Sequence, residues 1–136
     1  MASTHTYVDY DAGNARQLNI LVTCAAGTAT ITTTKIPYDL RGWYLYMLRT
    51  YPGTTAPTDA TDLFIPQHAS NGQDLLNAGG IDKIDATSTL TFQPFINGSE
   101  SVVPIIGDLW LAVSNNAVNA AIFTVELHLI KIGGAR

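Results

Sequence analysis

The sequence predicts an all-β fold: a single β-sandwich domain over residues 1–136, with about eight strands and a jelly roll as the expected arrangement. Three observations support this. Much of the chain alternates apolar and polar residues with a period of two, which is typical of half-buried strands. Clusters of Gly, Pro, Asn and Asp separate these runs. No segment shows the sustained periodicity of a long amphipathic helix.

The N-terminal part of the chain contains four predicted strands. Residues 5–11 form the opening strand, and residues 28–36 form a Thr-rich one. Residues 43–51 are apolar at consecutive positions, which predicts a central strand buried on both sides. Residues 17–24 alternate cleanly and place one apolar set on a single face: Leu18, Ile20, Val22 and Cys24.

The middle of the chain is rich in turn residues. Residues 52–58 form a loop, and residues 63–65 a short strand that ends at a proline. Residues 73–78 are compatible with one helical turn, which the following Gly-Gly pair would stop. Residues 87–95 alternate again as a strand, and residues 97–99 (Asn-Gly-Ser) form a turn.

The C-terminal part predicts a pair of strands joined as a hairpin. Residues 109–114 form the first strand, residues 115–119 the connection and residues 120–131 the second strand. In the second strand, the inward-facing residues are Phe123, Val125, Leu127 and Leu129. Those that face out are Thr124, Glu126 and His128.

The charge content limits the partners that the chain can have. Net charge is −4 with a pI near 5.0, and the seven basic residues are scattered, which argues against nucleic-acid binding. No apolar run approaches the roughly 20 residues of a membrane helix, and the N-terminus lacks the features of a signal peptide. Only 13% of the residues are charged, against a usual value of about 25%. Thr, Ser and Asn supply the polarity instead, which favours either an assembled protein or simply a Thr-rich sheet.

The sequence predicts no catalytic, cofactor-binding or metal-binding residues, and an enzyme is not expected. The single cysteine, Cys24, excludes an internal disulfide and a Cys-based zinc cluster, and its position predicts a small buried residue. His5, His68 and His128 match no zinc-binding spacing, so we interpret them as surface or interface residues. Phosphate-binding glycine loops and the G-x-S-x-G nucleophile motif do not occur.

Several aspartates lie in predicted turns, where carboxylates commonly accept backbone hydrogen bonds. The segment 9–14 begins like a calcium loop but lacks the later ligands. The functional alternatives for Asp82 and Asp85 are a cation site or an acid pair, and Asp59 and Asp62 follow the loop at 52–58. We interpret all four as structural residues of turns.

One apolar stretch is a candidate interface: Val102, Val103, Ile105 and Ile106. The proline between them argues against an interior strand and places the stretch on a loop or sheet edge. An exposed apolar patch of this kind marks a contact site. The alternative is a loop folded back over the end of the sandwich.

Three segments together resemble the small β-rich structural proteins of tailed bacteriophages. They are residues 46–65, which contain the loop Tyr-Pro-Gly-Thr-Thr-Ala-Pro-Thr; residues 72–88, with Gly-Gln-Asp-Leu-Leu and Ile-Asp-Ala-Thr-Ser; and residues 106–127, which begin Ile-Gly-Asp-Leu-Trp-Leu-Ala-Val. The resemblance spans residues 43–129. The stretch 102–106 is more apolar than this type of protein leads one to expect.

The resemblance implies a non-enzymatic virion protein, assembled in the host cytoplasm and needing no cofactor. The leading version is a homotrimeric capsid decoration or cement protein that binds the major capsid protein and stabilises the head shell, with neither nucleic acid nor membrane as partner. A second version is a neck or tail adaptor or a fibre-base protein. A third function is a carbohydrate-binding module that stacks sugars on Trp43, Trp110 and Tyr44. Both Trp residues lie in apolar strand runs, which favours core burial instead.

Overall fold

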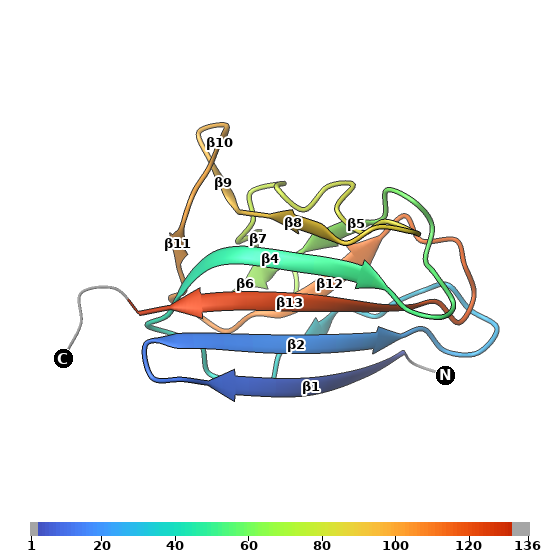
Figure 1. Cartoon of the computed structure of the whole chain (residues 1–136), viewed down its shortest axis with the longest axis horizontal. Coiled ribbons are helices and arrows are strands. Elements are labelled where there is room, and N and C mark those ends of the chain that lie inside the picture. Colours follow the sequence, from blue (N-terminus) through green and yellow to red (C-terminus); the bar gives the residue numbers. More distant parts are fainter. Residues whose placement is uncertain (1–2, 132–136) are drawn as a thin grey trace.

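The computed structural model describes residues 3–131, and every regular element in this range is a β-strand (Figure 1). The all-β prediction is therefore confirmed, with thirteen strands rather than about eight. In this same range, no helix is long and apolar enough to cross a membrane. The strands are β1 (Thr4–Asp11), β2 (Ala15–Thr23), β3 (Thr34–Lys35), β4 (Tyr44–Pro52), β5 (Asp62–Phe64), β6 (Pro66–Gln67), β7 (Gln73–Asp74), β8 (Leu90–Phe92), β9 (Phe95–Ile96), β10 (Ser99–Glu100), β11 (Val103–Pro104), β12 (Trp110–Ser114) and β13 (Ile122–Ile130).

The largest sheet, which we call the main sheet, contains the four long strands. Its order is β1-β2-β13-β4-β11, with β8 also paired to β4, and all its pairings are antiparallel. The C-terminal strand β13 therefore lies between β2 and β4, and β1 forms one edge (Figure 1). A tight turn joins β1 to β2: Gly13 has a positive φ of 84°, and the Ala12 N–H donates to the Ala15 carbonyl at 2.9 Å.

A second layer of short strands and loops packs against the main sheet. It contains the three-stranded sheet β3-β12-β5 and the two-stranded sheet β6-β7, while β9 and β10 form a separate hairpin. Asn97 and Gly98 close that hairpin with φ values of 53° and 79°, as the predicted Asn-Gly turn requires. This layer is much less regular than the second sheet of the expected sandwich, and most of its strands have only two or three residues.

The hydrophobic core lies between these two layers. The alternating residues of β2 and β13 that were predicted to face inward are buried, and so is Cys24. Leu63, Ile65 and Leu111 face them from the second layer, with Leu76 and Ile84 supplied by loops. Because β13 pairs on both sides, its inner residues contact neighbours in every direction, and all four are fully buried: Phe123, Val125, Leu127 and Leu129.

The predicted hairpin of residues 109–131 is wrong. β12 pairs with β3 and β5 in the second layer, whereas β13 pairs with β2 and β4 in the main sheet. The connecting loop crosses between the layers and is held by Asn116, whose amide nitrogen donates to the carbonyls of Ala29 and Val118, both at 3.1 Å. Its amide oxygen accepts the Thr58 N–H at 3.1 Å. Contacts to distant loops thus replace the hairpin ladder.

The predicted helical turn at residues 73–78 is also absent. One carboxylate, that of Asp74, accepts three backbone N–H groups at 2.9–3.1 Å: those of Ile65, Leu76 and Ala78. Asn77 and Ala78 have left-handed φ values of 50° and 68°, which end any right-handed helix. The segment is therefore a set of turns folded around a single side chain.

The Thr-rich segment 28–36 is a strand only at β3. The Thr30 N–H donates to the Thr28 hydroxyl at 3.1 Å, and the Thr34 hydroxyl donates to the Thr32 carbonyl at 2.8 Å. These local side-chain bonds compete with a sheet ladder and satisfy the backbone of a loop. The β propensity of threonine is therefore a poor guide in this segment.

Candidate functional site

The predicted interface stretch divides into two buried and two exposed residues. β11 pairs with the end of β4, and this strand geometry turns Val103 and Ile105 into the core, where both are buried. Val102 and Ile106 point outward and are 37% and 65% exposed. The edge position expected from the proline is confirmed, because Pro104 lies in the terminal strand of the sheet. Only Val102 and Ile106 remain available to a partner, and their role in an interface stays a prediction.

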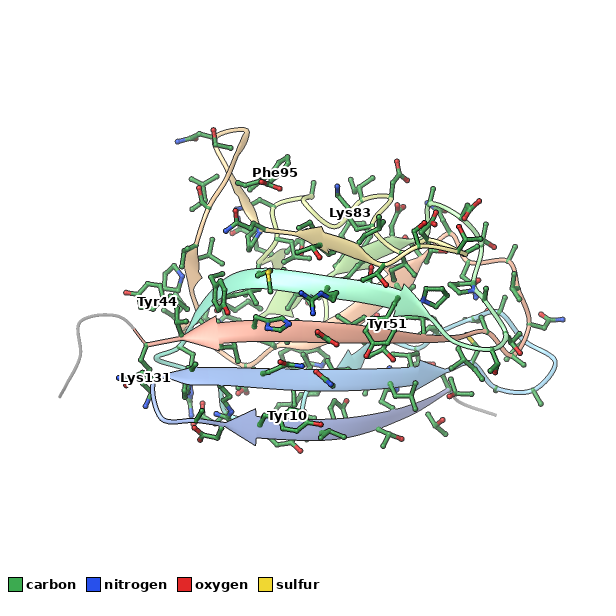
Figure 2. All side chains as sticks on the ribbon, in the orientation of Figure 1. Tyr10, Tyr44, Tyr51, Lys83, Phe95 and Lys131 are labelled. Atoms are coloured by element: carbon green, nitrogen blue, oxygen red, sulfur yellow. The ribbon has the colours of Figure 1, made fainter. Side chains whose placement is uncertain are left out.

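A larger surface is formed by the side of the main sheet opposite the core, which we call the outer face. Strand alternation and register place there these side chains of four neighbouring strands: Thr6, Val8 and Tyr10 of β1; Gln17, Asn19 and Leu21 of β2; Thr124, Glu126 and His128 of β13; Met47, Arg49 and Tyr51 of β4. Figure 2 shows Tyr10 and Tyr51 on this face. The described elements of the second layer pack on the other side.

Glu126 lies at the centre of this face and is only 6% exposed. The sheet register puts Arg49 directly across from it on β4 and Asn19 across from it on β2. Its Oε1 atom lies 2.9 Å from Nε2 of His128 and 3.5 Å from Nη1 of Arg49. The Tyr51 hydroxyl also bonds to this carboxylate. The pKa of Tyr51 is raised, mainly by burial and next by this bond to Glu126.

Glu126 and His128 face out, on the side opposite the core, as predicted, but both are buried there. Neighbouring side chains cover them: the Tyr46 ring packs edge-on against the His128 ring, with centroids 6.3 Å apart. Arg49 extends across from β4, and Gln17 lies beside His128 on β2. The sequence could not show this burial, because it arises from residues that only the strand pairing brings together.

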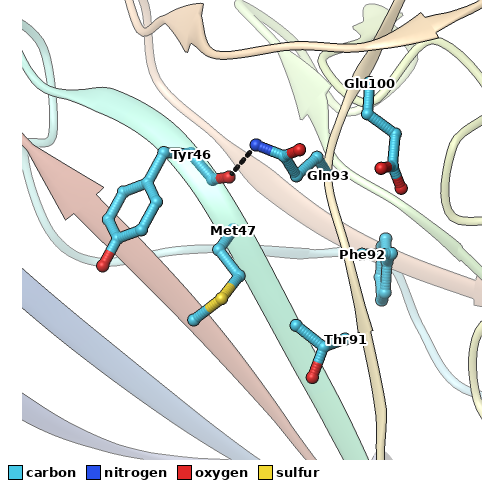
Figure 3. Close-up of a pocket in the computed structure, with 6 residues that line it drawn as sticks. All are labelled: Tyr46, Met47, Thr91, Phe92, Gln93 and Glu100. Carbon is cyan, nitrogen blue, oxygen red and sulfur yellow. Dashed lines mark hydrogen bonds between the residues drawn. The ribbon is translucent and has the colours of Figure 1, made fainter.

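A β-bulge in β4 gives the outer face its shape. The register of β13 against β4 shifts between His128 and Leu129, so Tyr46 is an extra residue in the ladder. Gln93 supplies a hydrogen bond to the backbone at the bulge: its side-chain amide donates to the Tyr46 carbonyl at 2.7 Å (Figure 3). The predicted two-sided burial of this strand is wrong for the same reason: Tyr46 and Met47 are only half-buried on the outer face.

The bulge separates two depressions, both lined by Tyr46. One has a volume of about 230 Å³, and its other lining residues are Met47, Thr91, Phe92, Gln93 and Glu100 (Figure 3). The second, of about 220 Å³, lies toward β1 and β2 and is lined by Tyr10, Ala12, Ala15, Arg16, Gln17 and His128. Each is smaller than the roughly 300–1,000 Å³ of ordinary small-molecule sites, so they suit single side chains of a partner.

Exposed apolar groups lie beside the polar centre of this face, on the side of β1 and β2. Val8, Tyr10 and Leu21 are 46%, 56% and 41% exposed, and they come from the neighbouring strands β1 and β2. Aromatic and aliphatic groups beside uncharged amides and a paired charge cluster are the usual composition of a protein-binding surface. The face can therefore offer apolar area, together with hydrogen-bond donors on Gln17 and Arg49, to an approaching molecule.

The remaining histidines lie on other elements. His5 is on the inner side of β1, where burial lowers its pKa, and His68 follows β6 with a positive φ of 78°. Within residues 3–131, no three His, Cys, Asp or Glu side chains come together as a metal-binding group.

The aspartates accept hydrogen bonds from the backbone N–H groups of loops. Asp59 accepts the Ala86 N–H at 2.8 Å, and Asp62 accepts the N–H of Asp82 at 2.8 Å. Asp85 accepts the N–H groups of Thr87 and Ser88, and the bond from Thr87 contributes most to lowering its pKa. These contacts agree with the structural interpretation.

The two tryptophans differ in their surroundings. Trp43 is buried in the core, with Lys131 Nζ 4.7 Å from its ring centroid. Trp110 is half-buried, and Lys35 Nζ lies 5.8 Å from its ring centroid. Trp43 therefore presents no exposed ring face for sugar stacking, and Lys35 lies over the ring of Trp110.

Comparison with known proteins adds no relative: no family model, no curated protein and no solved structure matches the chain.

Proposed function

We propose that this chain is a non-enzymatic structural protein that works by binding other protein surfaces, and that it decorates and stabilises the head shell of a tailed bacteriophage. The first part of the proposal rests on the outer face of the main sheet. The second part rests on the sequence resemblance to small virion proteins. The proposed partner is the major capsid protein or another virion protein, and the proposed location is the virion.

The observation that carries the binding role is the composition of the outer face. It exposes Val8, Tyr10 and Leu21 beside the Glu126 cluster, in which the charges are already paired. Covering such a surface removes apolar area from water at a gain of about 25 cal/mol per Å². The desolvation cost is low because the polar groups are mainly amides and hydroxyls rather than free charges.

A shell-stabilising role follows from mass action. A protein that binds the assembled shell and not its separated subunits shifts the equilibrium toward the shell. The second candidate, a neck or tail adaptor or fibre-base protein, would use the same surface at far fewer copies. The carbohydrate-binding alternative is disfavoured because Trp43 is buried and Lys35 lies beside the Trp110 ring.

The first test is the copy number of the protein in purified particles, measured by quantitative mass spectrometry against the major shell protein. Decoration predicts a ratio near that of the shell protein. A handful of copies per particle would overturn decoration in favour of the adaptor, and absence from particles would refute the virion role.

A second test asks whether the outer face makes the contact. Leu21→Ser removes an exposed apolar side chain from this face, whereas Ile81→Ser removes one from the loop between β7 and β8. We expect Leu21→Ser to weaken binding to heads that lack the protein, and Ile81→Ser to bind like the wild type. Equal binding by both variants would exclude Leu21 and its surroundings as the contact.

A further inference from the structure

Strand β1 is an open edge of the main sheet. It has eight residues, and among the described strands it pairs only with β2. At the opposite edge, by contrast, the short strands β8 and β11 both pair with β4. Figure 1 shows β1 along the border of the sheet. A long edge strand presents a row of unpaired backbone groups, which is a template for pairing with another strand.

The hairpin geometry fixes which residues offer those groups. The Ala12 N–H donates to the Ala15 carbonyl, so this pair is hydrogen-bonded. Hydrogen-bonded and non-hydrogen-bonded pairs alternate along an antiparallel ladder. The residues of β1 that bond to β2 are therefore Thr4, Thr6, Val8 and Tyr10. Those that direct their backbone N–H and C=O groups toward the open edge are His5, Tyr7, Asp9 and Asp11.

The usual protections of an edge are missing from β1. The strand contains no lysine, proline or glycine, and its eight residues pair with β2 in an uninterrupted register without a bulge. It has two inward-facing carboxylates: Asp9 is neutralised by Arg16, with two contacts of 2.9 Å, and Asp11, at the end of the strand, accepts the Gly13 N–H at 3.1 Å. Val8 and Tyr10 also leave it two exposed apolar side chains.

A second, independent observation concerns unsatisfied polar atoms. In the described part of the chain, three buried side-chain N or O atoms have no hydrogen-bond partner: Ser3 Oγ, His5 Nε2 and the Tyr7 hydroxyl. All three lie at alternate positions in or directly before β1, on its inner side. Buried polar atoms normally have partners, and a strand added at this edge would bring side chains to that same side, where these three groups meet them after a change of rotamer.

We propose that β1 pairs with β1 of a second copy of this chain, antiparallel and around a two-fold axis through Tyr7. In this register Tyr7 is opposite Tyr7, and His5 is opposite Asp9 of the other copy. These are the residues whose backbone groups point outward, so each pair exchanges both of its hydrogen bonds. On the outer side, Thr6 is opposite Val8.

The register is the reason why we propose a second copy of this chain as the partner of β1. A two-fold axis through Tyr7 places each His5 across from the Asp9–Arg16 pair of the other copy, and it keeps the two Asp9 side chains apart. The two main sheets become one continuous sheet, and their outer faces join into a surface twice as wide. This contact does not depend on a virion role, and its two-fold symmetry differs from the trimer that the resemblance implies.

The test begins with the mass of the purified full-length protein, measured by light scattering over a concentration series. We expect a dimer of two 14.6 kDa chains. The variant Thr6→Lys/Val8→Lys should be monomeric, because the two introduced ammonium groups of one copy are then opposite those of the other copy across the axis. Both positions are exposed, so the monomer should keep its melting temperature. Ile81→Lys/Ile106→Lys adds the same charge at exposed sites on other elements and should stay dimeric.

The axis is tested by cysteine crosslinking in a Cys24→Ala background. Thr6→Cys chains mixed with Val8→Cys chains should form a disulfide-linked heterodimer, because directly opposite residues of a non-hydrogen-bonded pair lie close enough to bridge. Val8→Cys chains alone should not crosslink. A monomer at every concentration, a trimer, a dimer that survives Thr6→Lys/Val8→Lys, or efficient crosslinking of Val8→Cys alone would each overturn the proposal.

Discussion

Glu126 and Leu127 are neighbours on β13, yet they belong to opposite faces of the main sheet and are buried for different physical reasons. Leu127 lies on the inner face, fully buried among apolar side chains from both layers. Glu126 lies on the outer face and is nearly as buried, but its neighbours are Arg49, His128 and Tyr51. Burial on the inner face comes from the packing of two layers, whereas on the outer face long polar side chains cover one another.

A sheet can thus bury charge without a second layer over it. Register places Arg49 directly across from Glu126, and the bulge places Tyr46 against His128. The cluster is therefore built by strand pairing, and its charges are matched within the sheet. A partner that covers this face meets a paired cluster rather than a free carboxylate, which lowers the cost of covering it.

The largest effect that we expect is on the free energy of unfolding, and it differs between the inner and the outer face. Leu127→Ala on the inner face should lower the free energy of unfolding by about 2–5 kcal/mol, because it leaves a cavity in a closely packed core. Leu21→Ala, on the outer face of β2 and 41% exposed, should change it by about 0.5 kcal/mol or less. Denaturant unfolding of both variants measures this; equal losses would contradict the assignment of faces.

The next effect tests the polar cluster. Glu126→Ala should lower the free energy of unfolding by about 1–3 kcal/mol, because it removes the shared acceptor of Arg49, His128 and Tyr51. Glu100→Ala is the matched control, since Glu100 is an exposed acid on β10. If thermal and denaturant unfolding show no difference between the two variants, the outer cluster contributes nothing to stability.

A smaller effect tests the bulge. Gln93→Ala should cost about 1 kcal/mol, because the Tyr46 carbonyl loses the amide donor that takes the place of a ladder partner. In the Gln93→Ala variant, amide hydrogen exchange should accelerate around the bulge, whereas the exchange rates along β2 should stay close to those of the wild type. Gln73→Ala, whose side chain is exposed on β7, serves as the control. Unchanged exchange around Tyr46 would show that the bulge does not need Gln93.

The smallest effect concerns alkaline pH. The pKa of Tyr51 is raised by burial and by its bond to Glu126, so the folded state keeps the phenolic proton longer than the unfolded chain, whose tyrosine has a pKa near 10.0. The stabilisation is complete below that pH and is lost as pH rises through the folded pKa. As pH rises above about 10, the Tyr51→Phe variant should therefore lose less of its free energy of unfolding than the wild type does. Parallel losses in both proteins would contradict this.

Much of the inner face could be predicted from the sequence. Period-two alternation in residues 17–24 and 120–131 identifies the buried residues of β2 and β13, including Cys24, because one face of each strand must be apolar for a core to form. The turns at Gly13 and at Asn97-Gly98 are also predictable, since these residue types favour positive φ. Such signals are local, so they do not depend on how the rest of the chain folds.

The outer face is less accessible to sequence reasoning. Its cluster needs β13 to lie beside β4, and Glu126 and Arg49 are far apart in the sequence. The bulge at Tyr46 breaks the alternation by one residue, which is why the pattern of residues 43–51 predicts burial on both sides. The stretch 102–106 illustrates the same limit: its apolar character is evident, but only pairing with β4 turns half of it inward.

Residue type and spacing along the chain were enough to establish the all-β class, the core residues of β2 and β13 and the scarcity of charge. They could not establish which strands are neighbours, that β12 and β13 belong to different layers, or that β1 is left as an open edge. Strand pairing is non-local: backbone hydrogen bonds are the same for every sequence, so the partner of each strand is chosen by the packing of the whole domain.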